Sequence, residues 1–100
     1  MTFREVCNVE DVPRGSSKIF KFDSVEIAIF NLGGEFFTVS NVCAHRGGQI
    51  GQGEIHQEEV SCPSHAWQFN IKTGNCLNVP GAKLKTYLTK LEKEKILVDL

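Results

Sequence analysis

Apolar and polar residues alternate with a period of two in three consecutive stretches of the chain, at residues 18–22, 25–32 and 35–40. Alternation of this kind is typical of β-strands that place one face against a core. An Asp-Ser pair separates the first two stretches and Gly33-Gly34 the last two, and both pairs suit tight hairpin turns. The pattern therefore predicts an antiparallel β-meander, with a core lined by Phe20, Phe22, Ile27, Ile29, Phe37 and Val39.

The segment at residues 41–81 has a different composition from the stretches before it. Glycine occurs at six positions and proline at two, so we expect loops carried by short strands. One hairpin is predicted to pair residues 54–55 with residues 60–61. Residues 67–71 should then lead into a turn at Thr73-Gly74.

The last part of the chain fits two interpretations. Leu84, Leu88 and Leu91 follow a helical spacing, whereas the final "KILVDL" is rich in residues that favour strands. Because the stretches before it are predicted as β, we expect two strands joined at residues 92–94. Residues 1–100 have the length of one domain, and that domain is predicted to be all-β.

Charge and composition exclude several partners. The chain has eleven basic and twelve acidic residues and a net charge of −1, which argues against duplex nucleic acid as a partner. No apolar stretch is long enough for a signal peptide or a membrane span, so we expect a cytoplasmic protein without a membrane partner. In a reducing compartment its four cysteines should be metal ligands or buried thiols rather than disulfides.

Two Cys–His pairs stand in the middle segment, in "CAHRGG" and "CPSH". Cys43 and His45 lie one residue apart, so an extended backbone directs both side chains to the same side. Cys62 and His65 lie two residues apart, and Pro63 between them stiffens a tight turn. Thiolate and imidazole are ligands of zinc and of iron–sulfur clusters, so both sites remain open at this point. The usual spacing of zinc sites pairs Cys with Cys and His with His, which makes zinc the less favoured alternative.

The sequences "CAHRG" and "CPSHAWQF" resemble the two cluster-binding loops of Rieske proteins. Sixteen residues lie between His45 and Cys62, as in that family, and the likeness continues through "GQGEI", "KTG" and the tail. It implies a Rieske fold: an antiparallel β-sandwich or meander with an inserted cluster-binding subdomain at about residues 41–81. It also implies one [2Fe–2S] cluster, with Cys43 and Cys62 on one iron and His45 and His65 on the other.

Departures from the membrane-bound Rieske proteins indicate which branch this chain resembles. Gly48 and Ser64 replace the two cysteines that form a disulfide in those proteins, and Ala66 replaces a glycine of many relatives. Trp67 and Phe69 stand where those proteins have hydroxyl groups that donate hydrogen bonds to sulfur. With fewer donors the reduced cluster is less stabilised, so we expect a reduction potential near the low end of the Rieske range, about −150 mV.

The resemblance implies an electron carrier and not an enzyme. It would take single electrons from a flavin-dependent NAD(P)H reductase and pass them to a terminal oxygenase, or serve as the small subunit of a nitrite reductase. The alternative is a redox-sensing or structural module. His56 is predicted to be exposed, and Cys7 and Cys76 to be buried or half-buried thiols in strands, with a regulatory disulfide as the less favoured alternative. A small, mostly uncharged docking tip is predicted at Arg46, Gly47, Gly48, Pro63, Ser64, Ala66, Trp67, Pro80 and Gly81, far from Lys93 and Lys95.

Overall fold

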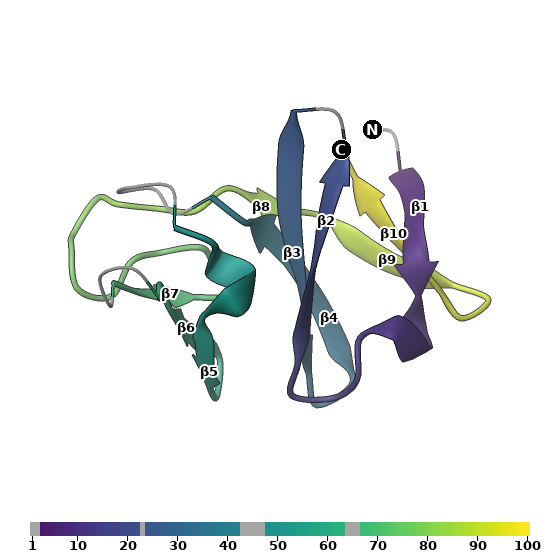
Figure 1. The fold of residues 1–100 in the computed structure, drawn as a ribbon, viewed down its shortest axis with the longest axis horizontal. Helices are drawn as coiled ribbons and strands as arrows, with labels where there is room; N and C mark the ends of the chain where they lie inside the picture. The colour runs from purple at the N-terminus through teal and green to yellow at the C-terminus, as the bar shows by residue number, and fades with distance from the viewer. Residues whose placement is uncertain (1–2, 23, 43–47, 64–66) are drawn as a thin grey trace.

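The computed structural model describes residues 3–22, 24–42, 48–63 and 67–100. Within these ranges the chain forms ten β-strands and two short 3-10 helices, arranged in three antiparallel sheets (Figure 1). The strands are β1 (Phe3–Asn8), β2 (Ser17–Phe22), β3 (Val25–Leu32), β4 (Glu35–Ser40), β5 (Glu54–His56), β6 (Glu59–Ser61), β7 (Gln68–Asn70), β8 (Thr86–Tyr87), β9 (Thr89–Glu92) and β10 (Lys95–Asp99). The 3-10 helices are η1 (Val9–Asp11) and η2 (Ile50–Gln52).

The predicted meander is confirmed as the sheet β2-β3-β4, to which the short β8 adds at the β4 edge. Gly33 and Gly34 connect β3 to β4 with φ values of 66° and 100°, a left-handed conformation that glycine adopts without strain. Because the turn fixes the register, Ala28 pairs with Val39 and Phe30 with Phe37.

The tail forms strands, so the helical interpretation is wrong for this segment. β9 ends at Glu92 and β10 begins at Lys95, with Lys93 and Glu94 in the turn, as the strand interpretation predicts. Strand β10 lies between β9 and β1, which was not predicted from the sequence pattern. Pairing with two neighbouring strands overrides the helical spacing of the leucines.

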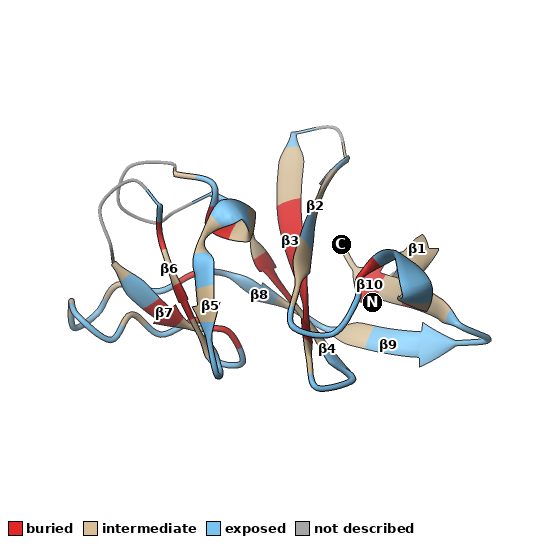
Figure 2. Ribbon diagram, turned by 60° about the horizontal axis from the view of Figure 1, so that its bottom comes forward, coloured by how far each residue is buried: buried red, intermediate tan, exposed pale blue. Residues whose placement is uncertain are grey.

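The core differs from the predicted one because β3 is buried on both faces, as its red centre shows (Figure 2). Ile27 and Ile29 pack with Ile96 and Val98, and Phe20 and Phe22 are half-buried against this first cluster. The prediction that Phe37 and Val39 share that core is wrong. They lie on the opposite face of the sheet, in a second cluster with Ala28 and Phe30.

The third sheet, β5-β6-β7, lies at one end of the molecule, and the β9–β10 turn lies at the other (Figure 1). Ile55 pairs with Val60, which confirms the predicted hairpin, and His56 is exposed as expected. After β7 the chain turns through Thr73 and Gly74. A Cβ at Gly74 would overlap the carbonyl oxygen of Leu84. Across the described ranges, none of the helices is long and apolar enough to cross a membrane.

Candidate metal centre

Of the four predicted ligands, Cys62 is among the described residues, and Cys43, His45 and His65 lie outside them. The predicted tip residues Arg46, Gly47, Ser64 and Ala66 also lie outside. Accordingly, the described part of the chain holds no group of three or more His, Cys, Asp or Glu side chains that could bind a metal ion. The site is therefore built up from Cys62 and from the residues that bound the two ligand loops.

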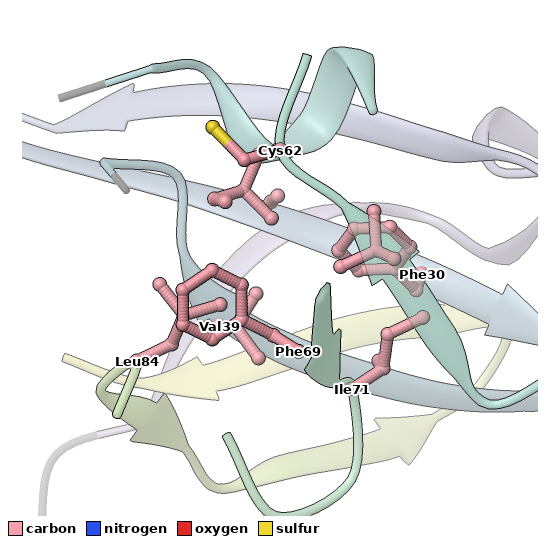
Figure 3. Close-up of a cluster of buried hydrophobic side chains, with 9 residues drawn as sticks. Phe30, Val39, Cys62, Phe69, Ile71 and Leu84 are labelled. Atoms are coloured by element: carbon pink, nitrogen blue, oxygen red, sulfur yellow. The ribbon is translucent and has the colours of Figure 1, made fainter. Parts of the chain in front are cut away.

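Cys62 directly follows β6 and is 1% exposed. Its neighbours in the second core cluster include Val60, Phe69 and Ile50, all of them apolar. Figure 3 shows the Cys62 sulfur at the edge of this cluster, directed away from the labelled side chains of Phe69 and Leu84. The thiol is free, so the sulfur is available as a ligand on its outer side. This position fits a thiolate ligand, because the shell of carbon atoms shields the sulfur from water on its inner side.

Both ligand loops are closed at their bases by main-chain hydrogen bonds. The Cys62 N–H donates to the Trp67 carbonyl oxygen at 2.7 Å, which closes the loop at residues 63–66. On the other loop, Val42 pairs with Gln49, and the Ile50 N–H donates to the Asn41 carbonyl oxygen at 2.8 Å. Ile50 and Cys62, which take part in these two sets of bonds, belong to one core cluster.

A third segment, residues 75–83, flanks this end. The Leu77 N–H donates to the Gln68 carbonyl oxygen at 2.7 Å, and Cys76 forms a bridge with Phe69, so the segment lies along β7. Beyond these contacts the chain turns through Pro80 and Gly81, both of which are exposed. Gly81 has a φ of 89°, which explains glycine at this turn.

The predicted tip residues that the structure describes have different exposures. Pro63, Pro80 and Gly81 are exposed, whereas Gly48 and Trp67 are half-buried. Phe69 is fully buried, and its ring centroid lies 6.4 Å from that of Trp67. Phe69 therefore contacts Trp67 from within the core, and it offers no surface to a partner.

Sequence reasoning missed two exposed apolar residues at this end. Val42 directly precedes Cys43 and is 47% exposed, and Leu77 on the flanking segment is 48% exposed. The available signal for Leu77 was a lone leucine in "NCLNVPG", a run otherwise rich in turn residues. Two such residues beside the same loops enlarge the apolar surface that the sequence predicted.

The cysteines outside the ligand pattern are free and half-buried, as predicted, although Cys76 forms an isolated bridge and does not lie in a strand. Cys7 lies in β1 against the first core cluster, where burial, assisted by Asp11 and opposed by Lys18, raises the pKa of its thiol from 9.0 to about 11. A thiol held in its neutral form at this position is a packing residue. Cys76 lies against the second cluster.

Comparison with known proteins gives consistent results. Residues 2–88 match the family described as Rieske [2Fe–2S] domain. The 3-phenylpropionate/cinnamic acid dioxygenase ferredoxin subunit of Escherichia coli strain K12 is 38% identical over 96 residues, covering 94% of this chain and 90% of that protein.

Two solved structures share the fold. The ferredoxin of carbazole 1,9a-dioxygenase from Nocardioides aromaticivorans is 26% identical, with a TM-score of 0.89 over 98% of this chain and 97% of that one. A candidate NADH-dependent nitrite reductase small subunit from Mycobacterium tuberculosis is 21% identical, with a TM-score of 0.88 over 97% and 93% of the two chains. At that identity the second likeness concerns the fold alone.

Proposed function

This chain belongs to the Rieske [2Fe–2S] domain family, and from that premise we propose that it carries single electrons between a reductase and a terminal dioxygenase. The family and the ferredoxin relatives assign it a Rieske-type [2Fe–2S] cluster. When bound, such a cluster takes up and releases one electron. The observation that carries the proposal is Cys62, a buried free thiol whose sulfur faces out of an apolar core at the base of a closed loop.

We propose that Cys43 and Cys62 hold one iron and that His45 and His65 hold the other. The spacing of both Cys–His pairs supports this assignment, as does the closure of both loops at one end of the molecule. We further propose that residues 41–81 act as the cluster-binding subdomain of a single domain spanning residues 1–100. The separate sheet β5-β6-β7 supports that division.

The side chains around Cys62 have two roles in this function. Phe69 and Ile50 exclude water from the inner side of the sulfur, because both are fully buried beside it. Neither Trp67 nor Phe69 has a hydroxyl that could donate to a cluster sulfur. We therefore expect a midpoint potential near −150 mV. A redox titration followed by circular dichroism measures it, and a value near +300 mV would contradict this account of the site.

The proposed donor is a flavin-dependent reductase, and the proposed acceptor is a terminal oxygenase. The E. coli relative supports the acceptor, since it is a dioxygenase ferredoxin subunit that aligns over 94% of this chain. The likeness to a nitrite reductase small subunit, at 21% identity, concerns the fold alone, so we favour the oxygenase as acceptor. We place the protein in the cytoplasm, in agreement with the free thiols of Cys7, Cys62 and Cys76.

We propose that the partner proteins dock on the end that carries the ligand loops. Val42, Leu77, Pro63 and Pro80 are exposed there and bear no charge. Contacts between electron-transfer partners are small, below about 1,200 Å² in total, so a few uncharged side chains can form most of the surface. Such a contact brings the loops close to a partner cofactor and still allows release.

Stopped-flow kinetics with the reductase and the dioxygenase test the proposal. Leu77→Asp places a charge on the docking end and should slow electron transfer to both partners at least fivefold, without changing the visible spectrum. Lys93→Glu is the control, since Lys93 is in the β9–β10 turn at the opposite end of the molecule (Figure 1). If Lys93→Glu slows both reactions and Leu77→Asp leaves them unchanged, the docking face is wrong. If the wild-type protein transfers no electrons to any terminal oxygenase, the proposed acceptor is wrong.

A further inference from the structure

Asn41 is a fully buried polar residue that lies two positions before the proposed ligand Cys43. Its main-chain N–H donates to the Glu26 carbonyl oxygen at 2.9 Å, and its own carbonyl oxygen accepts from the Ile50 N–H at 2.8 Å. Its side-chain Nδ2 donates to Glu26 Oε1 at 3.1 Å, and its Oδ1 accepts from the Gly51 N–H at 2.7 Å. The residue therefore connects three parts of the fold: the end of β4, strand β3 and the helix η2.

Both main-chain polar groups of Gly51 are bound by side chains. Asn41 Oδ1 accepts from its N–H, and the Ser17 hydroxyl on β2 donates to its carbonyl oxygen at 2.7 Å. A Cβ at position 51 would overlap the Ile19 side chain and come within 3.0 Å of Asn41 Oδ1. Only glycine permits this close approach, so the bond from Asn41 to Gly51 depends on the missing side chain.

A second close contact joins the end of η2 to the residue before Cys62. A Cβ at Gly53, the residue after η2, would overlap the carbonyl oxygen of Ser61, which directly precedes Cys62. Asn41 thus contacts η2 at Gly51, and Ser61 approaches Gly53, two residues further along the same backbone. Asn41 lies two positions before the proposed ligand Cys43, and Ser61 lies one position before Cys62.

We propose that the Asn41 carboxamide is a positioning group of the cluster site. It fixes the start of the first ligand loop against η2, and thereby sets the separation of Cys43 from Cys62. Because the potential of a cluster depends on the geometry and hydrogen bonding of its ligands, a change in that separation alters the reduction equilibrium. This inference rests on the proposed ligand assignment.

Asn31 supplies a matched control within the same chain. It is 4% exposed and, like Asn41, makes four hydrogen bonds. Its main-chain N–H donates to Ser16 O and its carbonyl oxygen accepts from the Gly15 N–H, while its side chain bonds Val12 O and the Gly34 N–H. These partners lie in the base of the molecule and not beside the ligand loops. Asn31→Ala therefore removes an equivalent pair of side-chain bonds, whose partners are Val12 and Gly34 and not a residue of η2.

The experiment compares the midpoint potentials and electron paramagnetic resonance spectra of the cluster-bearing wild type, Asn41→Ala and Asn31→Ala. Both variants should lose thermal stability to a similar degree. Asn41→Ala should also change the equilibrium constant for reduction at least threefold, about 28 mV for a one-electron couple in which tenfold corresponds to 59 mV. Its g values should shift, and its cluster should be lost faster in the presence of a chelator. Asn31→Ala should match the wild type in all three.

Ser17→Ala keeps the test decisive if Asn41→Ala does not fold. It removes the hydrogen bond from the Ser17 hydroxyl to the Gly51 carbonyl oxygen. The potential should shift in the same direction as in Asn41→Ala, by a smaller amount. The inference is wrong if the folded Asn41 and Ser17 variants keep the wild-type potential and g values, or if Asn31→Ala shifts them as much. A wild-type protein without a Rieske spectrum would instead overturn the proposed function, so the two failures are distinguishable.

Discussion

The base of the molecule, formed by β1–β4 and β8–β10, and the end that carries β5–β7 reach order by different means. In the base, β3 extends over eight residues and buries both of its faces. At the other end each strand of the third sheet has three residues, so pairing between strands supplies little of the structure. Both regions bury apolar side chains, but the turns between the short strands at the other end also depend on individual polar contacts.

Asparagine side chains show this dependence. Asn70 Oδ1 accepts from the N–H groups of Lys72 and Thr73, and Asn78 Oδ1 accepts from the Gln68 N–H. These bonds fix turns in which few main-chain groups have partners in a sheet. The difference between the regions teaches that turns between very short strands are fixed by local side-chain hydrogen bonds in addition to the core cluster beneath them.

The largest effect that we expect from a single substitution is in the ligand region. Cys62→Ser removes a thiolate from the proposed ligand set, and a hydroxyl does not replace it on a Rieske cluster. The purified variant should lack the visible bands and the electron paramagnetic resonance signal of the reduced cluster. The base should still fold, because its first core cluster contains no part of the ligand loops.

Cys76→Ser and Cys7→Ser are the matched controls for this prediction, one in each region. Both thiols are free and half-buried, Cys7 against the first core cluster and Cys76 against the second. Both variants should retain the cluster and its spectrum. An unchanged signal in Cys62→Ser, or loss of the signal in Cys76→Ser, would show that the ligand assignment is wrong.

The next prediction separates the two faces of β3. Phe30 packs in the second cluster with Cys62 and Phe69, and Ile29 packs in the first cluster, away from them. Phe30→Ala should lower the free energy of unfolding by about 3–5 kcal/mol, and Ile29→Ala by about 2–5 kcal/mol, since each leaves a cavity. Phe30→Ala should also shorten the lifetime of the cluster in the presence of a chelator, because the cavity weakens the packing of the core cluster that contains Cys62.

Urea titrations and the decay of visible absorption measure the two quantities. Equal cluster lifetimes in the two variants would mean that the second core does not support the ligand region in the way its contacts indicate. A shorter cluster lifetime in Ile29→Ala alone would mean that the first core cluster, and not the second, supports the ligand region.

The sequence predicted the base well where side chains on one strand alternate between a core and the surface. The three meander strands begin and end within one residue of the predicted positions, because their turns are marked by Asp-Ser and Gly-Gly pairs. Alternation could not show that β3 is buried on both faces, since a half-buried and a fully buried strand differ only in what packs on the second face. It also could not find β1, whose partner β10 is 87 residues or more away from it in the chain.

For the site, the spacing of the Cys–His pairs was enough to propose the family, which the comparison with known proteins confirms. The surroundings of Cys62 were not predictable to the same degree. Val42 and Leu77 were missed because exposure depends on how the loops pack and not on the residue type. Asn41 was missed because its four bonds join segments that local patterns treat separately.

A smaller effect distinguishes two glycines, one from each region. A Cβ at Gly53 would overlap the Ser61 carbonyl oxygen and lie 3.1 Å from that of Ile50, whereas nothing lies within 4 Å of a Cβ at Gly33. Gly53→Ala should therefore cost about 1–3 kcal/mol of unfolding free energy, as backbone must move. Gly33→Ala should cost about 1 kcal/mol, because alanine is strained at a φ of 66°.

Spectroscopy of the cluster gives a second comparison of Gly53→Ala with Gly33→Ala. Gly53→Ala should broaden the electron paramagnetic resonance lines, since the displaced Ser61 precedes Cys62, and Gly33→Ala should leave them as in the wild type. Equal costs and identical spectra would mean that the ligand region adapts to added volume as easily as a surface turn does.

The smallest expected effect is a pH dependence confined to the base. Burial raises the pKa of the Cys7 thiol to about 11 from the 9.0 of an exposed thiol, so the folded protein favours the neutral form. The contribution is fully present below pH 9 and is lost as the pH rises toward 11, because the folded state then holds a proton that the unfolded state has released. Solvent screening at a half-buried site reduces its size to about 1 kcal/mol.

Urea unfolding of the wild type and Cys7→Ala between pH 8.5 and 11 should show the stability difference between them shrinking by that amount, while the midpoint potential of the cluster is the same in both. A difference that stays constant across this range would show that Cys7 ionises in the folded protein as an exposed thiol does, and a shift in potential would show that the base and the ligand region are coupled through β1.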